Sequence, residues 1–195
     1  MKRFSYLVAF AIALGNAEAT AVVYRRAVRL YVETDYLFSA EQTREIATII
    51  ILAMFAISAG KNFLQRFAYF SCSFGVWDIS YYVWFKNIID WPPSLLTPDV
   101  LFTIPTIWIA PVLAPVICSL VMIFFGISLL YLQEKRGLPR IKQREWGMLF
   151  AGAAIIFISF VWNYLSGDIQ ADYNWLVFSL GIAFPLGAIF SLWRG

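Results

Sequence analysis

Residues 46–59 read Ile46-Ala-Thr-Ile-Ile-Ile-Leu-Ala-Met-Phe-Ala-Ile-Ser-Ala59, with no charge and no alternation of polar with apolar residues. A transmembrane β-strand would need that alternation, so the run predicts a helix. Lipid leaves every backbone N–H and C=O to be paired within the chain, which also favours a helix. Further segments are apolar over the roughly 20 residues that cross about 30 Å of hydrocarbon. The expected spans are Phe4–Tyr24, Glu45–Gly60, Phe63–Phe85, Ile104–Leu132, Trp146–Ser166 and Trp175–Trp193.

The composition points the same way. The chain has 195 residues, of which 61% are hydrophobic and 14% charged, whereas a soluble domain carries roughly 25% charged residues. These charges are too few to cover a globule in water. We therefore expect an all-α protein, a polytopic transmembrane bundle of about six helices, whose solvent is the lipid bilayer. No repeat or linker divides the chain, so residues 1–195 are expected to form a single transmembrane domain.

The N-terminal segment has two interpretations. Lys2 and Arg3 precede an apolar core, and Ala17-Glu18-Ala19 matches the cleavage site of a secretory signal. Apolar residues nevertheless continue to Tyr24, which makes the segment long enough to stay in the membrane. We expect a retained helix, with a cleaved signal as the alternative.

Basic residues predict the orientation. The loop at 133–145 is basic and the loop at 167–174 is acidic, so the positive-inside rule places the first in the cytoplasm. Both termini are then cytoplasmic, in a cell inner (plasma) membrane. Four arginines conflict with this rule, because they fall outside together with several acids. Either head groups and neighbouring acids hold this loop, or the first segment is not a plain crossing. The arginines are Arg25, Arg26, Arg29 and Arg44.

Two acids lie inside expected spans, where an ionisable side chain is costly and is usually functional or paired. Glu18 lies about 22 Å along its helix from Arg3, and Asp78 about 24 Å from Asn62, at 1.5 Å per residue. On the expected topology the two acids reach a similar depth in the outer half of the bilayer.

Helical spacing groups further polar residues with these acids. Glu18, Arg25 and Arg29 share one helix face, and Asp78 and Tyr82 share another. The functional hypothesis is an outward-facing pocket for a substrate or ion, with the two acids, Arg25 or Arg29 as counter-charge, and tyrosine hydroxyls as donors. The tyrosines are Tyr24, Tyr81 and Tyr82. The alternative is that each acid has a buried structural partner that fixes the helix register. The sequence does not establish that the first and third helices touch.

Three prolines lie in the first part of the fourth expected span. Pro105, Pro111 and Pro115 fall where this helix is expected to begin, and a proline inside a helix frees the carbonyl four residues earlier. For the last two prolines these carbonyls belong to Ile107 and Pro111. Such carbonyls line cavities in the broken helices of transporters. The alternative is a kink that is simply packed against its neighbours.

Two further patterns have ordinary explanations. Aromatic residues near the outer end of the third span match an interfacial belt, with a ligand cage as the alternative. Small residues at Gly147, Ala151 and Ala154 suit close helix packing, within the bundle or with a partner. The aromatic residues are Trp77, Tyr81, Tyr82, Trp84 and Trp91.

Several activities lack their usual residues. The chain contains no histidine, so neither a Ser-His-Asp triad nor a histidine metal site can be built. Cys72 and Cys118 fall in apolar segments, where free thiols are expected rather than a disulfide or metal pair. The net charge of +3 is spread over loops and forms no nucleic-acid-binding stripe. We expect no catalytic residue, no metal, no cofactor and no nucleic-acid partner.

Several motifs resemble an uncharacterised group of prokaryotic polytopic membrane proteins. The resemblance implies a prokaryotic inner membrane and brings no activity, cofactor or site residue with it. The motifs are Ala17-Glu-Ala19, Arg44-Glu-Ile-Ala47, Gly75-Val-Trp-Asp-Ile-Ser-Tyr-Tyr82, Asp90-Trp-Pro-Pro-Ser-Leu-Leu-Thr97 and Ala110-Pro-Val-Leu-Ala-Pro115.

Three functional hypotheses follow. The first is a non-enzymatic accessory, anchor or assembly subunit, which fits the short loops and the missing catalytic motifs. The second is a proton-coupled or small-solute transporter or channel that uses Glu18 and Asp78, and that would need self-association because no internal repeat is visible. The third is a lipid-modifying enzyme near the outer leaflet. Expected protein partners are other membrane subunits or further copies of this chain.

Overall fold

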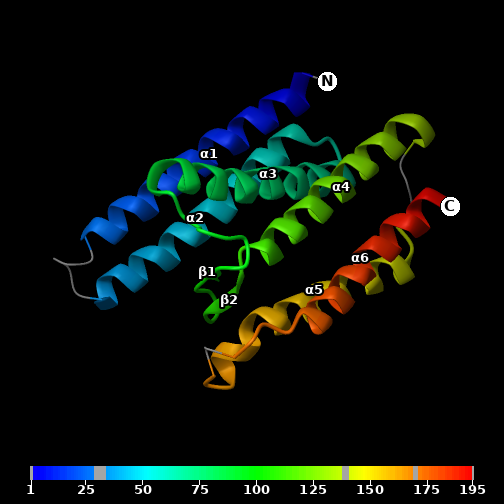
Figure 1. Cartoon of the computed structure of the whole chain (residues 1–195). Coiled ribbons are helices and arrows are strands. Elements are labelled where there is room, and N and C mark those ends of the chain that lie inside the picture. The colour runs from blue at the N-terminus through cyan, green and yellow to red at the C-terminus, as the bar shows by residue number, and fades with distance from the viewer. Residues whose placement is uncertain (1, 29–33, 138–140, 169–170, 195) are drawn as a thin grey trace.

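The computed structural model describes residues 2–28, 34–137, 141–168 and 171–194 (Figure 1). Within these residues the chain forms six helices, α1 (Lys2–Val28), α2 (Thr34–Ala59), α3 (Phe63–Ile89), α4 (Leu113–Arg136), α5 (Gln143–Leu165) and α6 (Trp175–Arg194). Two short strands, β1 (Pro98–Phe102) and β2 (Trp108–Pro111), stand between α3 and α4. All helices except α3 are long and apolar enough to cross a membrane. The expected all-α bundle is confirmed, and the chain has the build of a multi-pass membrane protein.

Helix α3 lies at the centre of the bundle and packs against α1, α2 and α4. Its 27 residues are enough to cross the hydrocarbon, at 1.5 Å per residue. It is absent from that group because polar side chains interrupt its apolar stretch, among them Ser71, Ser73 and Asp78, which are buried against neighbouring helices. A central helix can carry such residues because little of its surface meets lipid.

Helix α2 is polar inside and apolar outside. Glu41, Glu45 and Thr48 are buried, whereas Ile50 and Met54 are more than half exposed. In water such a helix would expose its apolar face at a large cost, while in lipid this face meets hydrocarbon. The prediction that the second span begins at Glu45 is wrong, because the helix already begins at Thr34. Its charged first turns looked like a loop, but they are helical because their charges point into the protein.

The fourth span also begins later than expected. Residues from Ile104 onward were predicted to be helical, but β1 and β2 pair antiparallel there, with Pro98 opposite Pro111, and α4 begins only at Leu113. Pro105 lies between the strands, Pro111 ends β2, and Pro115 lies in the first turn of α4, where proline is tolerated. None of the three prolines therefore breaks a helix, which corrects the broken-helix interpretation.

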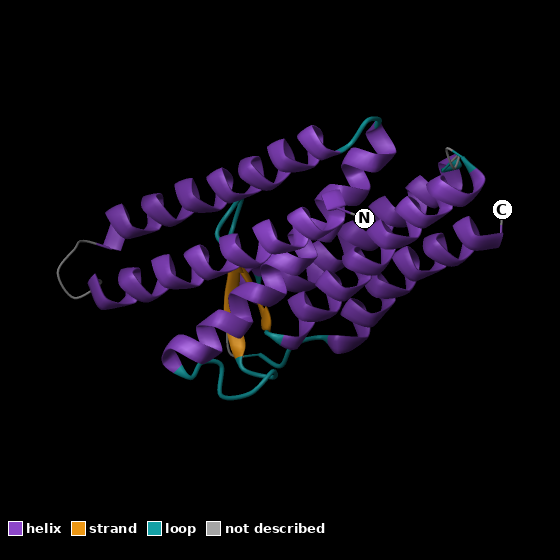
Figure 2. Ribbon diagram, turned by 90° about the horizontal axis from the view of Figure 1, so that it is seen from above, coloured by secondary structure: helices purple, strands orange, loops and turns teal. Residues whose placement is uncertain are grey.

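The strand pair forms a hairpin that lies within the outline of the helices (Figure 2). On one side Trp108 packs its ring 5.0 Å from that of Phe157 of α5. On the other side Thr103, which directly follows β1, binds α2 through Glu45. Non-helical backbone is tolerated inside a membrane protein where the protein itself encloses it and pairs its polar groups.

Helices approach one another most closely at glycines. A Cβ on Gly75 would lie 2.5 Å from the carbonyl oxygen of Ser119 on α4. A Cβ on Gly152 would lie 2.7 Å from Cδ of Pro185 on α6, so α5 and α6 pack in direct backbone contact. The small residues predicted for helix packing differ from these, because Gly147 and Ala154 are exposed.

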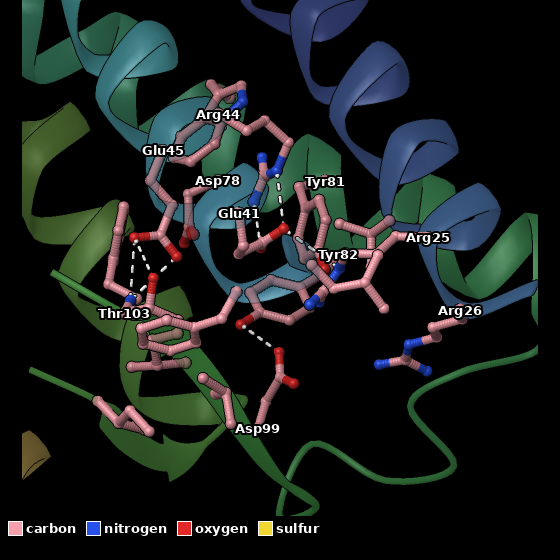
Figure 3. A pocket seen from close by; sticks show the side chains of 18 residues that line it. Arg25, Arg26, Glu41, Arg44, Glu45, Asp78, Tyr81, Tyr82, Asp99 and Thr103 are labelled. Carbon is pink, nitrogen blue, oxygen red and sulfur yellow. Dashed lines mark hydrogen bonds and ion pairs between the residues drawn. The ribbon is translucent and has the colours of Figure 1, made fainter. Parts of the chain in front are cut away.

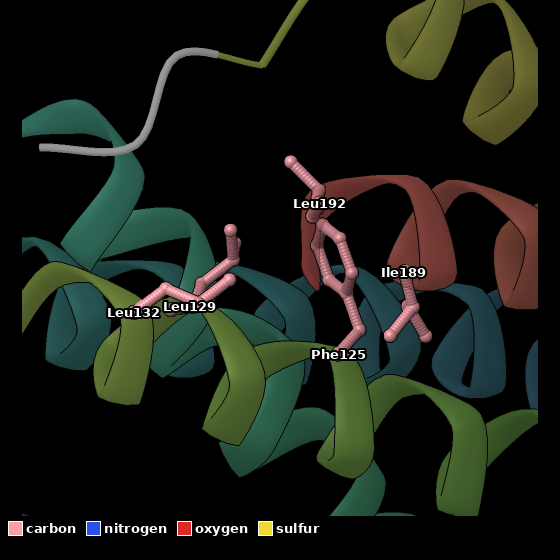
Figure 4. Close-up of a cluster of buried hydrophobic side chains, with 6 residues drawn as sticks. Phe125, Leu129, Leu132, Ile189 and Leu192 are labelled. Atoms are coloured by element: carbon pink, nitrogen blue, oxygen red, sulfur yellow. The ribbon is translucent and has the colours of Figure 1, made fainter. Parts of the chain in front are cut away.

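Helices α4 and α6 meet away from the hairpin in an apolar cluster (Figure 4). Figure 1 shows that the N-terminal end of α1 and the C-terminal end of α6 lie at the same end of the bundle. The hairpin lies toward the opposite end, together with the C-terminal ends of α1 and α3 and the start of α2. The cluster consists of Ala68, Phe125, Leu129, Leu132, Ile189 and Leu192.

Candidate functional site

A cavity of about 620 Å³ lies between α1, α2, α3 and the hairpin (Figure 3). Its volume is within the range of about 300–1,000 Å³ that is usual for small-molecule sites. Charged side chains line it to a degree that is unusual inside a membrane bundle. They are Arg25, Arg26, Glu41, Arg44, Glu45, Asp78 and Asp99.

The helical repeat of α2 brings its acids to the cavity. Glu41, Glu45, Thr48 and Leu52 are spaced by four, three and four residues, so they form one stripe along the helix. All of them are buried. The stripe is polar at the cavity and becomes apolar at Leu52, where the helix packs deeper in the bundle.

Two arginines are neutralised by acids beside the cavity. Arg44 forms an ion pair with Glu18, which also accepts a hydrogen bond from Thr48. Arg44 Nη2 lies 2.7 Å from Glu41 Oε1, and Arg25 Nε lies 3.2 Å from Glu41 Oε2. Arginines on the side predicted to be external are thus held by neighbouring acids, which was one of the two explanations for their position.

Three acids of the cavity have no such counter-charge. Among the described residues Glu45, Asp78 and Asp99 form no ion pair, and each is held by a hydroxyl group instead. Glu45 accepts from Thr103, Asp78 accepts from Ser119 Oγ at 2.7 Å, and Asp99 accepts from Tyr82 Oη at 3.3 Å. A hydroxyl group orients a carboxylate but does not neutralise it, and arginines act on Glu45 and Asp99 only from beyond ion-pair distance.

Aromatic rings complete the wall. Trp77, Tyr81, Tyr82 and Phe102 line the cavity together with the acids. The indole Nε1–H of Trp77 has no hydrogen-bond partner among the described residues, although the side chain is only 7% exposed. A buried donor of this kind calls for an acceptor from a ligand or from water.

Arg26 stands at the edge of the cavity and packs on aromatic rings. Its guanidinium carbon lies 4.5 Å from the ring centre of Phe85 and 4.9 Å from that of Trp91. Figure 3 shows its side chain apart from the arginines that pair with Glu41. Its charge is therefore held by cation–π contacts at the rim.

Asp99 belongs to the hairpin rather than to a spanning helix. Burial raises the pKa of its carboxyl group to about 6, although Arg26 and Arg25 act against the shift. The group therefore changes its charge close to physiological pH, which an ordinary aspartate does not.

The predicted site residues are only partly assembled. Arg25, Asp78 and Tyr82 line the cavity, but Glu18 does not, and no described contact joins Glu18 to Asp78. Arg25 was expected to balance Glu18, but it pairs with Glu41, and Arg44 takes its place at Glu18. Helices α1 and α3 do touch. Arg29 lies outside the described residues.

Sequence reasoning missed Glu45, Asp99 and Thr103 as parts of the site. The stripe from Glu41 to Leu52 was a readable signal, since its spacing is helical and polar at one end only. For Asp99 and Thr103 no local signal existed, because their place in the site depends on the hairpin.

The arrangement is suited to holding a positive charge. No group of three histidines, cysteines or acids converges for a metal ion among the residues that were described. The unpaired acids line the cavity together with aromatic rings. Carboxylates beside aromatic faces are the usual environment of an organic cation.

No family model, curated protein or solved structure matches this chain. The functional argument therefore depends on the site alone, and the resemblance seen in the sequence stays an expectation.

Proposed function

We propose that this multi-pass membrane protein binds a small organic cation in the cavity between α1, α2, α3 and the hairpin, and carries it in exchange for protons. This is the transporter hypothesis drawn from the sequence, except that Glu45 and Asp99 take the place of Glu18 beside Asp78. The observation that carries it is the group of Glu45, Asp78 and Asp99, which line a cavity of about 620 Å³ without an ion-pair partner among the described residues.

The balance of charge favours a cation over an anion. Acids in and directly beside the cavity outnumber arginines by two in the described chain. Inside a bundle, uncompensated carboxylates are costly, so they take up protons or a positive ligand. A cation that enters then displaces protons, which is the basis of coupling. The acids are Glu18, Glu41, Glu45, Asp78 and Asp99, and the arginines are Arg25, Arg26 and Arg44.

Glu18 has a structural role in this proposal. Its contacts with Arg44 and Thr48 use its carboxylate within the protein, so it fixes α1 against α2. Asp78 keeps the role of a ligand-binding acid, because Ser119 is its one hydrogen-bond partner in the described part of the chain.

We also propose that the cavity faces the outside of a prokaryotic inner membrane. The basic end of α4 and the start of α5 lie at the other end of the bundle, where the positive-inside rule places the cytoplasm. Both termini would then be cytoplasmic. Fusions of alkaline phosphatase to the C-terminus should be inactive, and fusions of a fluorescent protein should be bright. The reverse result would mean that the cavity faces the cytoplasm.

The first test is binding of tetramethylammonium to the protein in lipid nanodiscs, measured by isothermal titration calorimetry. We expect saturable binding that Asp78→Asn weakens roughly tenfold or more, because a buried charge loses its partner. Glu134→Gln, on the exposed end of α4, is the matched control and should bind as the native chain does. Acetate should not bind.

Transport needs a second measurement. Tetramethylammonium has a fixed charge and crosses lipid poorly, so its uptake into proteoliposomes reports on the protein. A proton gradient, acidic inside, should drive uptake, and Asp78→Asn should abolish it. Absence of binding by any small cation would overturn the proposed function, and binding without uptake would overturn the carrier part of it.

An accessory or assembly role is the second candidate. Gly147 and Ala154 lie on the exposed face of α5, and a Cβ on Gly147 would meet nothing within 4 Å. A helix of another membrane subunit, or of a second copy, could pack closely there. Gly147→Leu should then abolish co-purification of a stoichiometric partner. The lipid-modifying enzyme remains a prediction from the sequence.

A further inference from the structure

A second cavity, of about 400 Å³, lies between the α3–α4 pair and the α5–α6 pair, with the hairpin along its edge. Its walls are almost wholly apolar. They include Phe70 and Phe74 of α3, Met122 of α4, Phe157 of α5 and Ile182 of α6. Such a space suits a hydrocarbon chain and offers nothing to a small polar solute.

The two cavities are neighbours. Asp78, Leu101 and Phe102 line both of them. Ser119, which donates its hydrogen bond to Asp78, belongs to the wall of the apolar cavity. The boundary between a charged space and an apolar space therefore passes through one carboxylate and two residues of the hairpin.

We infer that the ligand is a cationic amphiphile, with its ammonium head in the charged cavity and its hydrocarbon chain in the apolar cavity. The inference rests on the proposed function and names the substrate class of the same site. Asp78 is placed where the head meets the chain, beside Leu101 and Phe102, which also line both spaces.

The chemistry of the two walls favours this division. An isolated carboxylate beside an apolar cavity is costly unless a positive group lies next to it. Ordinary alkyl chains could fill the apolar cavity but would leave Asp78, Glu45 and Asp99 without an ion-pair partner. A small cation would satisfy the acids but would leave the apolar cavity without the contacts that close packing provides. A cationic amphiphile satisfies both.

The test compares ligands that share one head group and differ in chain length. Tetramethylammonium, octyltrimethylammonium and dodecyltrimethylammonium are titrated into the protein in nanodiscs of one lipid composition. We expect affinity to rise with chain length, by roughly tenfold or more from the first to the last, because each methylene adds apolar contact. Partition of the longer ligands into lipid is the same for every variant, so variants are compared in the same nanodiscs.

Neighbouring alanines on α5 provide the matched variants. Ala153 and Ala154 are both exposed, but only Ala153 lines the apolar cavity. Ala153→Leu should fill the cavity and remove the gain from chain length, while binding of tetramethylammonium stays as in the native chain. Ala154→Leu should leave both affinities unchanged. Thermal unfolding of both variants checks that they fold.

A second readout does not depend on the variant of α5. Bromine at the end of the alkyl chain quenches tryptophan that it contacts, and Trp108 lines the apolar cavity. 12-Bromododecyltrimethylammonium should quench a smaller fraction of the tryptophan fluorescence in Trp108→Phe than in the native chain. The decrease should be larger than the loss of one tryptophan alone would cause.

The outcomes separate the two proposals. If tetramethylammonium binds but chain length or Ala153→Leu changes nothing, the amphiphile inference is overturned and the proposed function stands. If no member of the series binds, whatever its chain, both are overturned. If affinity rises with chain length and only Ala153→Leu abolishes the rise, the substrate class is a cationic amphiphile.

Discussion

Thr103 donates two groups to the carboxylate of Glu45, its backbone N–H at 2.9 Å to Oε2 and its hydroxyl at 3.0 Å to the same oxygen. This pair connects the tip of the hairpin to the middle of α2. The backbone N–H of Thr103 would otherwise be an unpaired donor inside the bundle. The hairpin and the acid stripe of α2 therefore depend on each other, and the cavity exists because they meet.

Removal of the Thr103 hydroxyl should destabilise the protein modestly. Thr103→Val keeps the shape and the backbone donor but loses one buried hydrogen bond, at a cost of about 1 kcal/mol or about 2–4 °C in Tm. Thr103→Ser keeps the hydroxyl and is the matched control. Thermal unfolding in nanodiscs measures both variants. Equal Tm values for the two would show that the side-chain bond does not hold the hairpin.

The ion pair between Glu18 and Arg44 should behave as a structural unit. Glu18→Gln leaves the arginine without its buried counter-charge, and breaking a buried pair costs about 3–5 kcal/mol. We expect the lower end of that range, since the Arg44 side chain is 26% exposed and also reaches Glu41. Denaturation of the protein in mixed micelles measures the change.

The double variant Glu18→Gln with Arg44→Gln is the control for this pair. It removes both charges and should recover more than half of the lost stability. It should also keep its affinity for tetramethylammonium, because Glu18 does not line the cavity. Loss of ligand binding with full stability would instead make Glu18 a residue of the site.

Packing of α5 on α6 should be sensitive to a single methyl group. Gly152→Ala places a Cβ 2.7 Å from Cδ of Pro185 and 2.8 Å from the carbonyl oxygen of Gly181, so the helices must separate. We expect a loss of about 1–3 kcal/mol. Gly147→Ala on the same helix meets nothing within 4 Å and should be neutral or slightly stabilising. A Gly152→Ala variant as stable as the Gly147→Ala variant would contradict the direct backbone contact between these helices.

Stability should depend on pH through Asp99. Its pKa is about 6 in the folded protein, raised by burial, against 3.8 for an ordinary aspartate. Between these values the folded state keeps a proton that the unfolded state has released, so stability falls as pH rises from about 4 to about 6 and is constant above that. Asp99→Asn removes this contribution.

The measurement is Tm at each pH from 4 to 7 for the native chain and for Asp99→Asn. The difference between the two should change only across the stated window. The affinity for a cation should rise with pH over the same range, because a cation favours the ionised carboxylate. Parallel Tm curves for the two proteins would show that Asp99 keeps an ordinary pKa.

Much of the fold could be predicted from the sequence, and the errors of that prediction have a common cause. Hydropathy located the apolar part of every helix, but it placed the start of α2 at Glu45 instead of Thr34 and the start of the fourth helix at Ile104 instead of Leu113. Charged turns that face a polar interior resemble a loop in hydropathy, and an apolar hairpin resembles a helix. Whether a residue faces lipid or the protein interior depends on its neighbours in the folded structure, which hydropathy along the sequence does not report.

The site was predicted in part for the same reason. Asp78 and Tyr82 were found because an acid inside an apolar segment is conspicuous, and their shared helix face follows from the helical repeat. The partner of Glu18 was not found, since Arg44 is 26 positions away in the sequence and lies on another helix. Pairing across helices depends on packing that no local pattern encodes.

The sequence by itself determined that this chain forms helices apolar enough to cross a membrane, because blocks of apolar residues long enough to cross hydrocarbon need helices whatever their neighbours are. It also determined which charges are costly enough to need partners. Only the tertiary structure decided what those partners are. The hairpin brings Thr103 to Glu45, α2 brings Arg44 to Glu18, and α4 brings Ser119 to Asp78. These contacts join distant segments, and the energy of a buried charge depends on which groups the fold places within a few ångströms of it.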